Sequence, residues 1–236
     1  SDPFPPRKER YYLGLCYSVR DRLLSRWLET QRSYYDSITK RVYYMSLEFL
    51  PGRFLMNYIQ ALGMEDDCRE AVRDFGLDLE ELLEEEWNPG LGNGGLGRLA
   101  SCYIDSMATC KIPGYGYGIL YDYGIFYQTI VNGYQHEGAD NWLRQDSPWV
   151  LRRGQFMFRI NFFGRSEAYE DSTGHERFRW VDTESVMAMA CDIMVPGHQN
   201  ANVTNMRLWK AISTRDFELE QFNQGDYIGA VQSKVE

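Results

Sequence analysis

The hydrophobic pattern at the start of the chain predicts a helix, a strand and a second helix. Apolar residues recur at helical spacing over residues 11–35, as expected for an amphipathic helix that buries one face. Residues 41–47 are rich in β-branched and aromatic side chains and predict a strand that ends at Glu48. A second helix is expected over residues 54–61. Because α/β proteins commonly carry functional residues at the carboxyl ends of strands, Glu48 is a candidate site residue.

The pattern changes in character near Pro113. Before it, helices are expected over residues 66–75 and 78–86, and the acidic run 80–86 reads as the solvated face of a helix. Beyond it, short apolar runs separated by turn residues predict strands. These runs cover residues 115–120, 125–130, 156–162, 178–183, 186–193 and 203–208.

Two further segments complete the predicted order of elements. Residues 164–177 are expected to form an exposed hairpin loop, and a last helix is expected to begin near Asp226. A βα start followed by many strands predicts an α/β sheet that carries a β-rich extension.

Residues 90–100 stand out as a glycine-rich segment that leads into a helix. They read Gly-Leu-Gly-Asn-Gly-Gly-Leu-Gly-Arg-Leu-Ala, with five glycines in eight positions. Glycine is costly to order, so such a cluster marks a backbone that approaches something closely or adopts positive φ. Past Gly97, apolar residues recur at helical spacing up to Ala108. A helix that starts in this way presents free N–H groups and a partial positive charge, which suits a phosphate group.

Two other interpretations of this segment remain open on pattern alone. The spacing Gly90-x-Gly92-x-x-Gly95 fits the dinucleotide-binding fingerprint, but that motif follows a strand, and here an acidic helical run precedes it. A nucleotide P-loop is excluded because no Gly-Lys-Ser or Gly-Lys-Thr ending is present. A tight turn that lets the following helix pack closely on its neighbour is as compatible with the pattern as phosphate binding.

Composition and charge exclude several classes of function. The net charge is −9, and a nucleic-acid-binding surface would need clustered lysine and arginine instead. The longest apolar stretch, residues 186–195, is interrupted by Asp192 and is too short to span a bilayer. The five cysteines are scattered without a Cys-x-x-Cys pair, and the three histidines lack ligand spacing, so no metal site is expected. With no signal-peptide pattern at residue 1, we expect a cytoplasmic chain that binds neither membrane nor nucleic acid.

Several motifs together resemble the N-terminal part of the α-glucan phosphorylases, the family of the glycogen, starch and maltodextrin enzymes. They occur in the family's order and extend over nearly the whole chain. The motifs are Tyr-Tyr-Met-Ser-Leu-Glu-Phe-Leu-Pro-Gly-Arg at 43–53, the glycine-rich segment at 90–100, Asp-Ser-Met-Ala-Thr at 105–109, Tyr-Gly-Tyr-Gly-Ile at 115–119, Trp-Val-Asp-Thr at 180–183 and Asn-Met-Arg-Leu-Trp at 205–209.

The resemblance implies a fold and a reaction. The fold is a two-domain glycosyltransferase-B-type enzyme, of which residues 1–236 would be an incomplete, Rossmann-like N-terminal half. That half would comprise a helical βα part with the active-site loop (1–112), a strand-rich part (113–225) and the start of an interface helix (226–236). The reaction is phosphorolysis of the terminal α-1,4-linked glucose of an α-glucan by orthophosphate, which releases glucose 1-phosphate. The resemblance further implies a homodimer.

The implied cofactor is pyridoxal 5'-phosphate, used through its phosphate group rather than its ring. In the family a Schiff-base lysine in the C-terminal domain holds it, and none of the lysines here lies in a matching motif; they are Lys8, Lys40, Lys111, Lys210 and Lys234. We therefore expect this chain to be a fragment that is inactive alone. A non-catalytic glucan-binding or assembly module of the same fold is the alternative.

The resemblance also assigns roles to residues of the glycine-rich loop. Asn93 and Leu96 match the catalytic centre, with the Leu96 amide beside the bound glucose, and the Gly94 and Gly95 amides match positions that approach the cofactor phosphate. Glu48 matches an active-site carboxylate near that phosphate, and a salt bridge that merely orders the strand end is the alternative.

Other matches concern regulation and subunit contacts. Trp27, Gln31 and Tyr35 match positions near the nucleotide effector site of the animal enzymes, and Asp2 matches a contact from the partner subunit. Their spacing places the first three along one helical face, so an aromatic face packed at the subunit interface is equally compatible. Three further residues match positions linked to subunit contacts or allosteric control: Cys68, Cys102 and Tyr115.

Overall fold

The computed structural model describes residues 7–143 and 147–212, and these form two compact units. One unit contains the chain up to Arg152 together with Cys191–Leu208, and the other contains Arg153–Ala190 together with the chain from Trp209. Asp2 and the helix expected from Asp226 lie outside the described residues.

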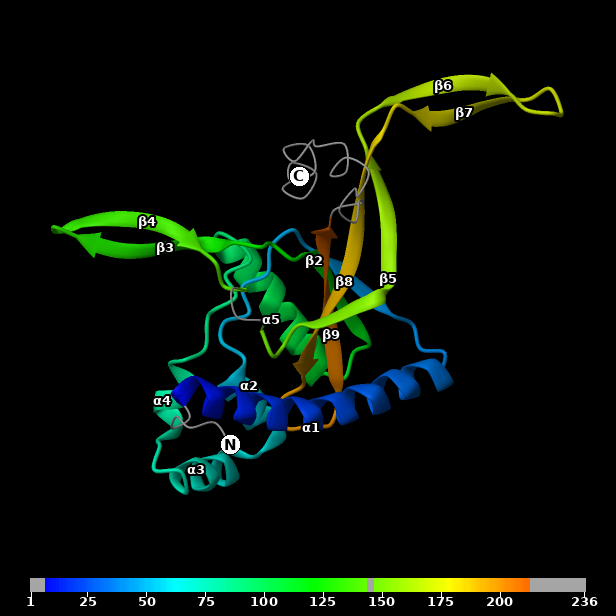
Figure 1. Ribbon diagram of the computed structural model, residues 1–236. Helices are drawn as coiled ribbons and strands as arrows, with labels where there is room; N and C mark the ends of the chain where they lie inside the picture. Colours follow the sequence, from blue (N-terminus) through cyan, green and yellow to red (C-terminus); the bar gives the residue numbers. More distant parts are fainter. Residues whose placement is uncertain (1–6, 144–146, 213–236) are drawn as a thin grey trace, which may run out of the picture. The chain divides into compact units, whose positions relative to one another are not determined.

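Four helices precede the glycine-rich segment: α1 (Lys8–Asp36), α2 (Leu55–Leu62), α3 (Glu65–Arg73) and α4 (Leu79–Leu83) (Figure 1). All four were expected from the hydrophobic pattern, although α1 begins earlier than residue 11 and α4 ends before residue 86. The buried residues of α1 recur every three or four positions, which confirms the amphipathic stripe. They are Tyr12, Cys16, Val19, Leu23, Trp27, Thr30 and Tyr34.

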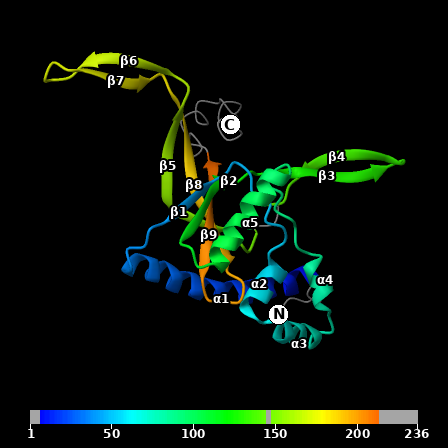
Figure 2. The same ribbon diagram turned by 180° about the vertical axis from the view of Figure 1, so that it is seen from behind.

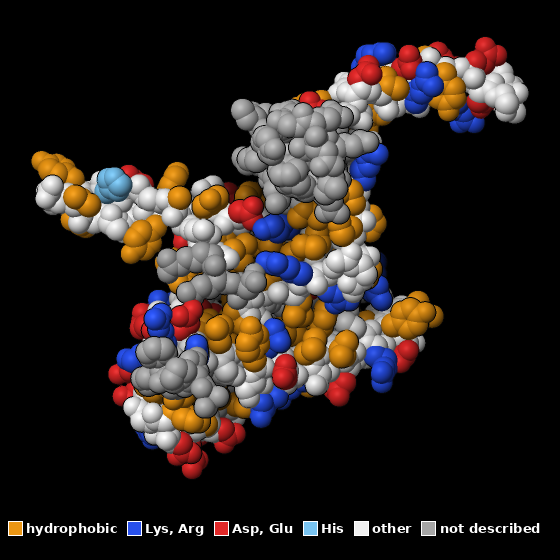
Figure 3. Space-filling model, viewed as in Figure 1, with side chains coloured by type: hydrophobic (Ala, Val, Ile, Leu, Met, Phe, Trp, Pro, Cys, Tyr) orange, Lys and Arg blue, Asp and Glu red, His pale blue; other side chains and the backbone are white. Residues whose placement is uncertain are grey.

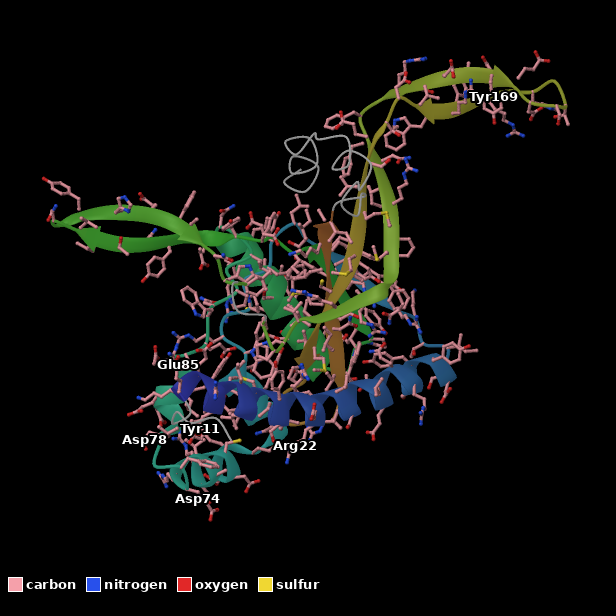
Figure 4. All side chains as sticks on the ribbon, viewed as in Figure 1. Tyr11, Arg22, Asp74, Asp78, Glu85 and Tyr169 are labelled. Atoms are coloured by element: carbon pink, nitrogen blue, oxygen red, sulfur yellow. The ribbon has the colours of Figure 1, made fainter. Side chains whose placement is uncertain are left out.

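The N-terminal end of α1 packs against α4 and the loop between α3 and α4. The ring of Tyr11 lies 5.1 Å from the ring of Phe75, and the Lys8 ammonium donates to the Glu81 carboxylate at 2.5 Å. Figure 4 shows Tyr11 at this end of α1, facing the region where Asp74 and Asp78 flank the loop between α3 and α4. These contacts connect the first helix to the segment that leads into the glycine-rich loop.

The main sheet has the strand order β1-β2-β9-β8-β5. Its strands are β1 (Val42–Met45), β2 (Gly114–Ile119), β5 (Leu151–Phe162), β8 (Glu184–Pro196) and β9 (Val203–Ile212). The pair β1 and β2 is parallel, with Val42 opposite Gly114 and Met45 opposite Tyr117. Parallel strands need a crossover connection, and the helices between β1 and β2 provide it. The predicted α/β class is thus confirmed.

Helix α5 (Gly95–Thr109) crosses close to β2, as Figures 1 and 2 show from opposite sides. A Cβ atom at Gly114 would lie 2.7 Å from the Met107 sulfur, and one at Gly116 would lie 3.3 Å from the end of the Ile104 side chain. Gly114 and Gly116 of β2 therefore allow helix and strand to approach more closely than side chains would permit.

Two antiparallel hairpins extend the strand-rich part. One joins β3 (Gly124–Val131) to β4 (Tyr134–Asp140), and the other joins β6 (Arg165–Glu170) to β7 (Glu176–Val181). Strand β4 was not expected, because its residues are mostly polar, yet Asn132 and Gly133 both adopt positive φ and close the tight turn that pairs it with β3. Figure 3 shows hydrophobic side chains exposed along the β3–β4 hairpin.

The prediction of an exposed hairpin loop over residues 164–177 is wrong in part, because strand β6 occupies the first half of this segment. Its polar residues gain cross-strand partners instead of a buried face. The Arg179 guanidinium donates to Glu167 at 2.8 Å and lies 5.6 Å from the ring of Tyr169, which Figure 4 labels on this hairpin. Within the described residues, no helix is long and apolar enough to cross a bilayer.

Candidate phosphate-binding loop

The glycine-rich loop is hydrogen-bonded to the segment that follows β1. The Phe49 amide donates to the Leu91 carbonyl at 2.8 Å, and the Leu50 amide donates to the Gly97 carbonyl at 3.0 Å. The Arg98 guanidinium adds bonds to the carbonyls of Leu50 and Pro51, at 3.1 and 3.0 Å. Two segments far apart in the sequence therefore form one rigid unit around the start of α5.

Two of the five glycines are needed for this packing. A Cβ atom at Gly92 would lie 2.9 Å from the Glu48 Cβ atom, and one at Gly97 would lie 3.1 Å from the same atom. Separations this short force a neighbour to move, and both positions also face the Leu50 side chain at 3.3 Å. Close packing, one of the interpretations left open by the sequence, thus accounts for Gly92 and Gly97.

Gly94 and Gly95 lie in a different environment. A Cβ atom at either position would meet no atom within 4 Å among the described residues, and residues 93–96 are all exposed. Gly94 has φ 179°, which is extended backbone, so conformation does not demand glycine there. No packing or conformational reason within the described chain therefore accounts for glycine at these two positions.

The loop ends at the amino terminus of α5. The first bond of the helix runs from the Arg98 amide to the Gly94 carbonyl at 3.0 Å. The amides of Gly95, Leu96 and Gly97 precede that donor, so helix geometry gives them no partner within the helix. Together with the helix dipole, these N–H groups favour a bound anion, and the exposed Gly94–Leu96 backbone leaves room for one.

Glu48 and Asn93, two of the predicted site residues, are in direct contact. The Glu48 carboxylate accepts from the Asn93 amide and from the Asn93 side chain, both at 3.1 Å. The Ser46 hydroxyl donates to the Glu48 carbonyl at 2.8 Å and fixes the backbone there. Through these two bonds, the Glu48 carboxylate holds Asn93 at the start of the loop.

Glu86, which precedes the glycine-rich loop in the sequence, is a buried carboxylate, and the sequence-based prediction of its exposure was wrong. It was expected on a solvated helical face, but it is only 4% exposed. It accepts from the amides of Phe54 and Leu55, at 2.8 and 3.0 Å, and from the Trp149 indole at 2.8 Å. Burial raises the pKa of Glu86, and these three donors oppose the rise. The helical spacing gave no signal of this, because α4 ends at Leu83.

A partly buried carboxylate, Asp105, lies within α5. Asp105 lines a cavity of about 20 Å³ together with Asn57, Tyr58 and Ser101. Burial raises its pKa to about 6, and the positive charge of Arg98 opposes the rise. A group of this kind titrates close to neutral pH and links the stability of α5 to pH.

The residues matched to regulation are only partly brought together. The Tyr115 hydroxyl donates to the Gln31 side-chain oxygen at 2.7 Å, and the Tyr43 ring stacks on Tyr115 at 5.8 Å. The buried side-chain nitrogen of Gln31 has no hydrogen-bond partner among the described residues. Trp27 is buried, whereas Tyr35 is 77% exposed, so these two residues of α1 do not share an environment.

The two cysteines matched to subunit contacts lie on separate helices. Cys68 is buried on α3, and Cys102 is partly exposed on α5. Neither approaches the pair formed by Gln31 and Tyr115 through any contact found in the described ranges. In the same ranges, no cluster of histidine, cysteine and carboxylate side chains could hold a metal ion.

Comparison with known proteins identifies the family. The family model for carbohydrate phosphorylases matches residues 72–236. Over 221 residues, 94% of this chain, the sequence is 51% identical to the brain form of glycogen phosphorylase from Homo sapiens and 52% identical to that from Bos taurus. It is also 51% identical to the Homo sapiens liver form. The chain spans 26% of the length of these relatives. By these matches, the chain belongs to the carbohydrate phosphorylase family.

Proposed function

We propose that this chain is the part of a glycogen or α-glucan phosphorylase that supplies the phosphate-facing loop of the active site. The complete enzyme would transfer the terminal α-1,4-linked glucose of an α-glucan to orthophosphate and release glucose 1-phosphate. The relatives named glycogen phosphorylase support this reaction. Because the chain spans 26% of their length, the remaining parts of the site would come from the rest of the enzyme.

One observation carries the proposal. The loop leaves open space at Gly94 and Gly95 on the outer side, while Gly92 and Gly97 are packed on the inner side. Glycine at an exposed position costs conformational entropy without any gain in packing, so a close approach by something outside this chain accounts for it. An anion held by the first amides of α5 meets that requirement.

The exposed amides at the start of α5 fit the phosphate of pyridoxal 5'-phosphate, and the resemblance to the family suggests a role for each residue of the loop. The amides of Gly94 and Gly95 would donate to phosphate oxygens, and the Leu96 amide would lie beside the bound glucose. The Glu48 carboxylate accepts hydrogen bonds from the backbone amide and the side-chain nitrogen of Asn93. Asn93 is thereby held toward Glu48, and the amides of Gly94 and Gly95 would remain accessible to a ligand. When bound, the cofactor would supply a phosphate group for proton transfer, as the resemblance implies, and the loop amides would hold that group in place.

Other parts of the proposal concern the whole enzyme. The lysine that anchors the cofactor would lie outside this chain, so the chain alone would be inactive. The complete enzyme would be a cytoplasmic homodimer with the two-domain architecture of the family. If the purified chain released measurable glucose 1-phosphate from glycogen, this division of the active site would be refuted.

The test of the loop is Gly95→Ala in a full-length phosphorylase that carries this sequence. An added methyl group meets no atom of the described residues within 4 Å but would obstruct the phosphate, so turnover should fall by about a hundredfold, the scale set by loss of one oxyanion-type donor. The affinity of the apoenzyme for pyridoxal phosphate should fall as well. Gly14→Ala on the exposed face of α1 is the matched control.

Unchanged turnover in the Gly95→Ala enzyme, with folding intact by circular dichroism, would contradict the loop assignment. The alternative, a non-catalytic glucan-binding or assembly module, predicts that turnover is absent in the unmodified full-length protein while glycogen still binds. Glycogen co-sedimentation and a phosphorolysis assay on the same preparation separate the two.

A nucleotide effector site is a second candidate, and it rests on Gln31. Among the described residues, the side-chain oxygen of Gln31 accepts a hydrogen bond from Tyr115, whereas its buried side-chain nitrogen has no hydrogen-bond acceptor. That nitrogen could therefore donate to a ligand. Asp2, Trp27 and Tyr35 would complete such a site, and Cys68 and Cys102 would contribute to subunit contacts. Titration of the full-length enzyme with AMP, before and after Gln31→Leu, tests it.

A further inference from the structure

The buried carboxylate of Glu86 caps the N-terminus of α2, although the two are far apart in the sequence. The first residues of α2 have no side-chain cap of their own, and the Glu86 carboxylate accepts from the amides of Phe54 and Leu55 instead, at 2.8 and 3.0 Å. The Trp149 indole fixes one carboxylate oxygen at 2.8 Å. Helix-terminal amides need such acceptors, and a buried carboxylate needs such donors.

The place of Glu86 in the chain connects this cap to the candidate site. Phe54 follows directly on the segment Glu48–Arg53, which carries the site carboxylate. Glu86 itself precedes Gly90 by only four positions, at the entry to the glycine-rich loop. Figure 4 shows its neighbour Glu85 near the N-terminal end of α1.

The same two segments are joined again at the site itself. There the Phe49 amide donates to Leu91, the Leu50 amide donates to Gly97, and the Asn93 amide donates to Glu48. The chain from residue 48 to residue 54 and the chain from residue 86 to residue 97 thus run between two points of attachment. Any movement at Glu86 would shift the two segments against each other at the loop.

A surface ion pair links Arg53 to Glu84, two positions before Glu86 in the sequence, and differs from the Glu86 cap in burial. The Arg53 guanidinium donates to the Glu84 carboxylate at 3.0 and 3.2 Å, and the Glu84 side chain is 75% exposed. Exposed ion pairs contribute little, whereas removing the charge of a buried acceptor leaves several donors unsatisfied. Glu84 therefore provides a matched comparison for Glu86.

We propose that Glu86 is a positioning residue for the phosphate-binding loop. It holds the segment that bears Glu48 in register with the glycine-rich loop, and so determines where the Gly94 and Gly95 amides point. The inference rests on the proposed function of that loop, because the position of its amides affects activity only if they bind a phosphate group. Glu86 touches neither phosphate nor glucan in this arrangement and acts through Glu48 and Asn93.

The test is Glu86→Gln in the full-length phosphorylase, which keeps size and shape but replaces one acceptor oxygen by a donor. We expect hydrogen exchange of the Phe49, Leu50 and Asn93 amides to become about tenfold faster, while the Ile104 amide in α5 is unaffected. The affinity of the apoenzyme for pyridoxal phosphate should fall about tenfold, because the Gly94 and Gly95 amides would no longer be held in place. Glu84→Gln should change neither exchange nor cofactor affinity.

Two results would overturn the proposal. One is unchanged exchange at Phe49, Leu50 and Asn93, and the other is acceleration that includes Ile104 equally, which would show a general loss of stability. Should Glu86→Gln fail to fold, Trp149→Phe removes one donor and keeps the two backbone bonds, and it should raise exchange at the same amides by a smaller factor. Unchanged exchange in that variant would likewise refute the role.

Failure of this inference is distinguishable from failure of the proposed function. If Gly95→Ala lowers cofactor affinity but Glu86→Gln leaves the three amides unchanged, the loop binds phosphate without help from Glu86. If Glu86→Gln accelerates the three amides while Gly95→Ala leaves cofactor affinity unchanged, the two segments are coupled but the loop is not the phosphate site.

Discussion

Gly92 and Gly97 differ from Gly94 and Gly95 in what a side chain at each position would meet. At the first two, an added Cβ atom would lie 2.9 and 3.1 Å from the Glu48 Cβ atom, and at the other two it would meet nothing within 4 Å of the described chain. A single sequence motif therefore contains glycines of two kinds. Those that face inward let two segments pack, and those that face outward leave the first amides of a helix accessible. Substitution of each kind should give a different result.

Gly92→Ala should have the largest effect on stability. The new methyl group would overlap the Glu48 side chain, whose Cβ and carboxylate oxygen lie at 2.9 and 3.1 Å, and overpacking of this kind costs about 2–3 kcal/mol. Urea denaturation of the chain measures the loss. A loss below about 0.5 kcal/mol would show that Glu48 moves freely, and the distinction between inner and outer glycines would then fail.

Asp105 offers a way to change the stability of α5 without altering either pair of glycines. Its pKa of about 6 in the folded chain, against 3.8 for an ordinary aspartate, means that the folded state holds the proton more tightly. The contribution is favourable below about pH 4 and is lost as pH rises through about 6. With allowance for partial exposure, this loss amounts to about 2 kcal/mol.

Asp105→Asn should therefore be more stable than the unmodified chain at pH 7 and nearly equal to it at pH 4. The measurement is the difference between the two denaturation curves at several pH values, so that other titrating groups cancel. A difference that does not change with pH would contradict the raised pKa.

Gly97→Ala should have a smaller effect than Gly92→Ala, although both face Glu48. Its Cβ atom would lie 3.1 Å from Glu48 and 3.3 Å from Leu50, so a neighbour must yield by a few tenths of an ångström. Gly97 lies inside α5, however, where alanine is favoured over glycine by about 1 kcal/mol. We expect the two terms to leave a net loss of about 1 kcal/mol, measured in the same urea experiment.

The sequence predicted the regular elements where periodicity or composition carried the signal. The apolar stripe of α1 and the β-formers of β1 placed those elements within a few residues. Strands β4 and β6 were missed because their stability comes from partners across a hairpin, and a polar strand has no pattern of its own. In β4 the Asn132-Gly133 turn was the signal available.

The same limit applies to the site. The pattern alone predicted close approach or positive φ in the glycine-rich loop, but only the structure shows which glycines face Glu48 and which face outward. The burial of Glu86 depends on Phe54, Leu55 and Trp149, which lie 32, 31 and 63 positions away in the sequence. No local pattern records contacts at such separations.

Gly94→Ala should have the smallest effect on the isolated chain, and this makes it the clearest contrast with Gly92→Ala. No atom of the described residues lies within 4 Å of the new methyl group, and the backbone at φ 179° is open to any residue. The change in unfolding free energy should stay within about 0.5 kcal/mol, as for other exposed positions. In the full-length enzyme the same substitution should weaken pyridoxal phosphate binding, because the methyl group would occupy the space that the phosphate needs. A variant that is both fully stable and fully able to bind the cofactor would leave glycine at this position without a physical reason.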